Sequence, residues 1–141
     1  MNLYAESSAV LAWLFREAPG PLLEEIMERA ELVVASDLTL LECHRALVKV
    51  EAAGQLSQFE VGQRRSILEN VSSRWTLLKI DEEILDRAQR RFPQEPVRSL
   101  DSLHLATAVA ARSLVREITL LSLDRRIRDN GAALGFDVVP G

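Results

Sequence analysis

Apolar residues along this chain fall alternately into short continuous runs and into longer stretches with helical spacing. The short runs predict strands, which cover residues 2–5, 32–35, 75–80, 118–121 and, as a short edge strand, 136–139. Strands that alternate with helices, with no linker or repeat between them, are typical of an α/β protein. We therefore expect a single domain over residues 1–141, a three-layer α/β/α sandwich with a central parallel sheet of four to five strands.

The stretches between the strands have apolar residues three and four positions apart, as amphipathic helices do. They predict helices at residues 9–17, 21–30, 36–53, 57–71, 82–92, 97–111 and 125–134. Ser7 or Ser8 is suited to cap the first helix, and Phe92, which precedes a proline, to end the fifth. Asn130 and Gly131 have low helix propensity and are expected to weaken the last helix near its middle.

The segment 97–111 carries Asp101 and His104 among residues that are otherwise almost all apolar or small. Such a helix is expected to be buried, and a lone buried carboxylate costs several kcal/mol unless a cation or hydrogen-bond donors meet it. Two interpretations stay open for Asp101: an ion pair with Arg98, one turn earlier, or a metal ion. We interpret His104 as a packing residue or as a polar residue behind the acid.

Three further acids, Glu6, Glu42 and Asp124, lie where a predicted strand has just ended or a helix begins. The carboxyl ends of parallel strands form the edge at which ligands bind in open α/β sheets. Two of these acids have a purely structural alternative. Glu6 can act as negative charge beside a helix N-terminus, and Glu42 can pair with Thr39 in a capping box.

Carboxylates that converge in one cleft repel each other and stay ionised only if cations neutralise them. Mg²⁺ and Mn²⁺ prefer oxygen ligands, whereas zinc sites usually contain paired histidines or cysteines, which this chain lacks. A site of this kind supports hydrolysis of a phosphodiester by a water that the metal makes more acidic. A nucleotide-binding glycine loop and a serine nucleophile elbow are both absent from the sequence.

Composition narrows the class of protein further. The chain has 21 acidic and 17 basic residues, a formal net charge of −4, which argues against broad adhesion to nucleic acid but is compatible with a nuclease that has a local basic rim. No apolar run approaches the roughly 18 residues that span a bilayer, and a signal-peptide pattern is missing, so we expect a cytoplasmic protein. The single cysteine, Cys43, is expected to be a small packing residue.

Four motifs, in this order along nearly the whole chain, resemble those of the PIN-domain ribonucleases, and within that family the VapC-type toxins of toxin-antitoxin pairs. The first is YAESSAVLAWL, an acid after the first strand followed by small residues. The second, SDLTLLECHRAL, contains a serine and then a glutamate. The third, RSLDSLHLATA, and the fourth, LLSLDRRI, each contain an aspartate, and in the fourth a serine stands two positions before it.

The resemblance implies a metal-dependent endoribonuclease that cleaves RNA with Mg²⁺ or Mn²⁺. The implied catalytic and metal-binding residues are Glu6, Glu42, Asp101 and Asp124, and the implied supporting hydroxyls are those of Ser8 and Ser122. It also implies a homodimer and a small antitoxin protein that lies along the grooves of the toxin. Trp13, Leu14 and Phe15 are candidates for contact with the antitoxin. Separately, Arg98, Arg125 and Arg126 are candidates for binding RNA phosphates, or are solvated residues of helix faces.

The chain departs from the family pattern at its first acid, which is usually aspartate and here is Glu6. The extra methylene moves the carboxylate by about a bond length, while Mg²⁺ requires ligands at roughly 2.0 to 2.1 Å in a near-ideal octahedron. The alternative to a toxin-type nuclease is therefore a PIN-like module that binds an antitoxin or RNA without cleaving. A small-molecule phosphatase is a third hypothesis, for which the sequence offers no dedicated motif.

Overall fold

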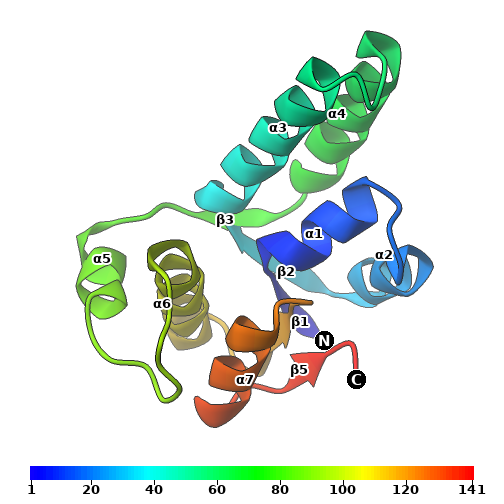
Figure 1. Ribbon diagram of the computed structural model, residues 1–141. Coiled ribbons are helices and arrows are strands. Elements are labelled where there is room, and N and C mark those ends of the chain that lie inside the picture. The colour runs from blue at the N-terminus through cyan, green and yellow to red at the C-terminus, as the bar shows by residue number, and fades with distance from the viewer.

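The computed structural model describes residues 1–141 and is built around a five-stranded sheet of order β3-β2-β1-β4-β5 in which all neighbouring strands are parallel (Figure 1). The strands are β1 (Asn2–Ala5), β2 (Leu32–Ser36), β3 (Thr76–Leu78), β4 (Ile118–Leu121) and β5 (Val138–Val139). The helices are α1 (Ser7–Leu14), α2 (Gly20–Arg29), α3 (Asp37–Ala52), α4 (Gln58–Ser72), α5 (Glu82–Ala88), α6 (Ser99–Leu114) and α7 (Arg125–Ala133). The predicted three-layer α/β/α architecture with a parallel sheet is confirmed.

The sheet separates two apolar cores. Successive side chains of a strand point to opposite faces, so Leu3 and Ala5 of β1 join a core with α1 to α4. Tyr4, between them, joins the other core with α5, α6 and α7. Because β1 is the central strand and is covered on both faces, the residue that follows it is placed at the middle of the carboxyl edge.

Several elements differ from the sequence-based prediction in their boundaries or in their burial. The helix expected to reach Phe92 ends at Ala88, because the Phe92 side chain turns into the core and its N–H donates to Glu95 Oε2 at 2.9 Å. The strand expected at 75–80 is shorter, since β3 is an edge strand whose residue Leu77 remains 39% exposed. Helix α6 is not buried all round, because Leu114 at its end is exposed.

Asn130 and Gly131 do not interrupt α7, which runs through both residues. A Cβ atom at position 131 would collide with the Cδ2 atom of Leu120, so glycine allows α7 to lie directly on β4. The buried Asn130 side chain accepts a hydrogen bond from the Gln94 N–H at 2.8 Å and donates to the Gln94 carbonyl at 3.0 Å. Both residues that weaken an isolated helix are therefore used for tertiary packing.

Cys43 is a packing residue, as expected, and is fully buried in the core formed with α1 to α4. Burial, reinforced by the nearby negative charges of Glu42 and Glu6, raises the pKa of its thiol to about 12. Because the thiolate is the nucleophilic form, this cysteine is inert in the folded protein. None of the seven helices combines the length and apolar character that crossing a membrane requires.

Candidate active site at the carboxyl edge of the sheet

The first acid, Glu6, follows the central strand β1 directly and is only 3% exposed. Its Oε1 atom accepts hydrogen bonds from the hydroxyls of Ser8, at 2.5 Å, and Ser122, at 2.6 Å. Its Oε2 atom accepts the Ser8 N–H at 2.9 Å, which makes Glu6 the N-cap of α1. The prediction of a serine cap was wrong, and the structural alternative for Glu6, negative charge at a helix N-terminus, is part of what this residue does.

The two serines connect Glu6 with Asp124 at the start of α7. Ser8 Oγ accepts the N–H of Leu123, at 2.9 Å, and that of Asp124, at 3.1 Å. Ser122 Oγ also accepts the Asp124 N–H at 3.1 Å. Asp124 itself caps α7, since its Oδ1 atom accepts the Ile127 N–H at 3.0 Å. The structure thus brings Glu6, Ser8, Ser122 and Asp124 together in one hydrogen-bonded unit.

Glu42 lies in α3 and belongs to a second polar group, with Ser7 and His104. Its Oε1 atom accepts His104 Nε2–H at 2.6 Å and the Ser7 hydroxyl at 2.9 Å. The capping box expected with Thr39 is absent, because Ser36 caps α3 and the buried Thr39 hydroxyl lies 3.2 Å from Ser7 Oγ. The contact of Ser7 with Glu42 and His104 could not be seen in the sequence, where a serine beside a helix start is interpreted as a cap.

The charges in this group stabilise each other. Burial alone would raise the pKa of Glu42, but the hydrogen bond and the charge of His104 outweigh it and hold this pKa below the usual value. Burial likewise opposes protonation of His104, while the hydrogen bond to Glu42, and then the charges of Glu6 and Glu42, raise its pKa. His104 is 3% exposed and its Nδ1 atom is buried without a hydrogen-bond partner. It is a polar residue behind the acid rather than only a packing residue.

Asp101 lies in the first turn of α6 and is partly exposed. Its pKa is raised, first by burial and then by the negative charge of Asp124, against the smaller opposing effects of His104, Arg126 and Arg98. The ion pair with Arg98 that the sequence left open is not formed. A carboxylate whose charge is disfavoured by burial and by a neighbouring acid is stabilised most directly by a cation.

Asp101 and Asp124 face an open pocket of about 650 Å³ between the starts of α6 and α7. The cationic residues that line it are Arg98, Arg125 and Arg126. Arg125 makes only an exposed pair with Asp129 at 3.8 Å, and the other two arginines form no ion pair at all. The pocket therefore contains two carboxylates, which can bind a cation, and three guanidinium groups, which can bind an anion.

The donor set of this edge suits a hard divalent cation, because it consists of carboxylate oxygens. Glu42 and Asp124 each use one oxygen for hydrogen bonds within the protein and keep the other without a protein donor. Glu6 Oε1 accepts two hydroxyls, while Oε2 accepts one N–H and retains a lone pair. No three acidic, histidine or cysteine side chains stand close enough together to enclose a metal ion. Asp101 and Asp124 are the two acids that line one pocket.

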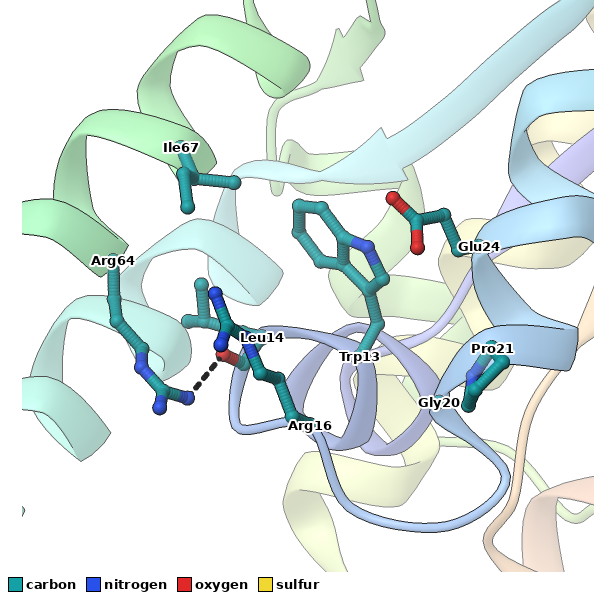
Figure 2. A pocket seen from close by; sticks show the side chains of 8 residues that line it. All are labelled: Trp13, Leu14, Arg16, Gly20, Pro21, Glu24, Arg64 and Ile67. Carbon is teal, nitrogen blue, oxygen red and sulfur yellow. Dashed lines mark hydrogen bonds between the residues drawn. The ribbon is translucent and has the colours of Figure 1, made fainter.

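A separate pocket lies beside the C-terminal end of α1, where α1, α2 and α4 meet (Figure 2). Figure 2 shows the Trp13 indole between Ile67 of α4 and Glu24 of α2. Arg64 closes one end, since its guanidinium donates to the Leu14 carbonyl at 2.8 Å. Trp13 also lines a neighbouring pocket that carries three acids, Glu24, Glu28 and Glu31, and one cation, Arg74. The half-buried Trp13 is thus the wall shared by two pockets, whereas Leu14 is buried in the core.

A parallel α/β/α sheet with acids at its carboxyl edge is the arrangement of a PIN domain, and the PIN domain family model matches residues 3–133. The chain therefore belongs to the PIN domain family. It is 33% identical to Ribonuclease VapC46 of Mycobacterium tuberculosis over 97% of this chain and 95% of that protein. The resemblance to the VapC ribonucleases is confirmed.

Solved structures agree with this fold. FitAcB from Neisseria gonorrhoeae matches with a TM-score of 0.73 and 15% identity over 98% of this chain and 96% of that chain. A toxin-antitoxin complex from Klebsiella pneumoniae matches with a TM-score of 0.63 and 17% identity, covering 99% of this chain and 97% of that one. At such identities the likeness concerns the fold alone.

Proposed function

We propose that this chain is a metal-dependent endoribonuclease and the toxin of a toxin-antitoxin pair. The observation that carries this proposal is the coupled pair Asp101 and Asp124 in a pocket edged by three arginines, at the carboxyl edge of a PIN fold. The similarity to a VapC ribonuclease over nearly the full length of both chains supports it.

Asp101 and Asp124 would hold the Mg²⁺ or Mn²⁺ ion, and Glu6 and Glu42 would add negative charge at the same edge of the sheet. When bound, the cation acidifies a water and neutralises charge that develops on the phosphate. Glu42, fixed through one oxygen by His104 and Ser7, presents its other oxygen to orient the attacking water and accept its proton. Glu6 completes the acidic set and fixes the turn that carries Asp124.

The arginines of the pocket hold the substrate. Arg98, Arg125 and Arg126 surround the two aspartates and bind phosphate oxygens of RNA on either side of the bond that is cleaved. A guanidinium group binds a phosphate through two parallel hydrogen bonds, which fixes the orientation of the strand as well as its position.

The test is cleavage of a mixed-sequence RNA by the antitoxin-free protein with Mg²⁺, with Mn²⁺ and with a chelator. We expect cleavage with at least one of the two metals and none with the chelator, because the cation both activates the water and neutralises the acids. Folded protein that binds RNA but cleaves it with neither metal would contradict the proposal. It would favour the alternative, a PIN-like module that does not cleave, which is suggested by Glu6 at the position where the family usually has aspartate.

We further propose that the antitoxin occupies the two pockets that share Trp13, with apolar side chains beside the indole and basic side chains beside the three acids. The structural likeness to a chain of a toxin-antitoxin complex supports such a partner. Homodimerisation is also part of the proposal, supported by Leu114 at the end of α6, which is 72% exposed.

Replacing Trp13 by alanine is expected to weaken the complex with the product of a small upstream reading frame by about 2 kcal/mol, roughly thirtyfold in Kd. The reason is that truncation removes the wall common to both pockets. Titration calorimetry of the two purified proteins measures this change. The matched control is Leu85→Ala, at an exposed leucine on α5 in the opposite helical layer. An equal loss of affinity for that variant would contradict the assignment of the antitoxin to the two pockets that share Trp13.

A further inference from the structure

A second basic hollow adjoins the acidic pocket at the first turn of α6. Its volume is about 460 Å³, and the segment that joins α5 to α6 forms most of its wall, including Arg90, Arg91 and Glu95. Ser99 lines this hollow and also the pocket that contains Asp101 and Asp124. The two depressions are therefore neighbours on one surface, separated only by the start of α6.

The cations of this hollow are unpaired. Arg90 and Arg91 are exposed and form no ion pair, although the chain as a whole carries a net charge of −4. The only carboxylate in the wall, that of Glu95, is already engaged, since it accepts the N–H of Phe92 at 2.9 Å and that of Val97 at 2.8 Å. What the hollow offers to a ligand is therefore positive charge.

The segment that carries these arginines is fixed in place despite having no regular secondary structure. The Phe92 ring is buried, and the Arg87 guanidinium stacks on it at 4.2 Å from the ring centroid. The Asn130 side chain joins Gln94 to α7 through two hydrogen bonds. Because the backbone is already ordered, a ligand that binds Arg90 and Arg91 has only to order their side chains.

We propose that Arg90 and Arg91 form a subsite for the phosphates of the RNA strand that flank the cleavage point. A strand whose cleaved phosphate lies at Asp101 and Asp124 continues past Ser99 into the second hollow. Arginine is suited to bidentate phosphate contact, so guanidinium groups in two adjoining depressions can bind successive phosphates of one RNA strand. This subsite rests on the proposed ribonuclease function and extends it to the length of RNA that the protein recognises.

The test compares the double variant R90A/R91A with the wild type by fluorescence anisotropy of a labelled, mixed-sequence single-stranded RNA, in chelator and over a range of salt concentrations. Two lost phosphate contacts reduce the slope of log K against log salt by about 1.4, since each contact on a single strand contributes about 0.7. We also expect the affinity at low salt to fall on the order of tenfold. The double variant K49A/R116A, which removes the same charge from exposed positions outside both hollows, leaves the slope unchanged.

A second readout separates this subsite from the catalytic proposal. With Mn²⁺, R90A/R91A raises KM for long RNA and leaves kcat unchanged, while an RNA trimmed on the side that enters the hollow is cleaved equally by both proteins. Binding in chelator does not depend on cleavage. If the wild type cleaves no RNA but R90A/R91A still has the smaller salt slope, the nuclease proposal is refuted and the subsite is supported. Equal slopes for the folded double variant and the wild type overturn the subsite. Loss of antitoxin binding with unchanged RNA binding also overturns it and assigns the arginines to an acidic protein segment.

Discussion

Asp101→Asn is expected to lower kcat for RNA cleavage by about 10³-fold while the protein stays folded. The change keeps the size of the side chain and removes the charge that pairs with Asp124 to hold the cation. The Asp101 side chain accepts no hydrogen bond within the protein, so no donor is left unsatisfied when its charge is lost. Single-turnover cleavage with saturating Mn²⁺ measures the effect on the chemical step.

The stability of the same variant distinguishes a catalytic role from a structural one. Because the pKa of Asp101 is raised in the folded state, its ionised form is disfavoured by folding, and this unfavourable contribution grows as pH rises through the carboxylate range. Neutral asparagine is therefore expected to leave the melting temperature unchanged or slightly higher at neutral pH. Asp86→Asn, on the exposed face of α5, is the matched control. Unchanged cleavage by Asp101→Asn in a pure preparation would remove Asp101 from the site.

The second large effect is expected at Glu6, where substitution by alanine lowers the free energy of unfolding by about 3 kcal/mol. The carboxylate accepts three hydrogen bonds in a buried position, from the N–H and hydroxyl of Ser8 and from the hydroxyl of Ser122. The hydroxyls can rotate toward other acceptors, but the N–H at the start of α1 cannot. Urea unfolding followed by circular dichroism measures the loss.

Two companion variants of Glu6 make this result specific. Glu17→Ala, an exposed acid just after α1, is expected to change stability by no more than about 0.5 kcal/mol. Glu6→Asp is expected to destabilise as well, although aspartate is the usual residue of the family, because the shorter side chain does not reach Ser8 and Ser122 together. A Glu6→Ala variant as stable as the wild type would show that the three donors find other partners.

The pattern of strands and helices was predictable because it depends on local periodicity and on the rule that parallel strands need helical crossovers. The joining of Glu6 and Asp124 through Ser8 and Ser122 follows from that topology, since these acids lie just beyond the carboxyl ends of the neighbouring parallel strands β1 and β4. The early end of α5 was not predictable from local sequence. Nothing in the residues around Phe92 shows that its ring packs on Arg87 and that Glu95 accepts its N–H.

The partners of the acids were the least predictable part of the site. Thr39 and Glu42 have the spacing of a capping box, and only the approach of His104 from α6 shows that the carboxylate is used elsewhere. Ser7 and Ser8 are both plausible caps in sequence, yet each lies beside a different acid, because adjacent residues at a helix start point in different directions. Hydrogen bonds between segments almost one hundred residues apart are set by the packing of whole elements.

The close contact between α7 and β4 restricts how this sequence can change over evolutionary time. Gly131 has no room for a Cβ atom because the fully buried Leu120 side chain occupies that space. A lineage that acquires a larger residue at 131 while Leu120 is intact must displace the Leu120 side chain, which has no free space around it. A smaller residue at 120 relieves this clash, so the two positions are expected to change as a pair among relatives that keep this edge of the sheet intact.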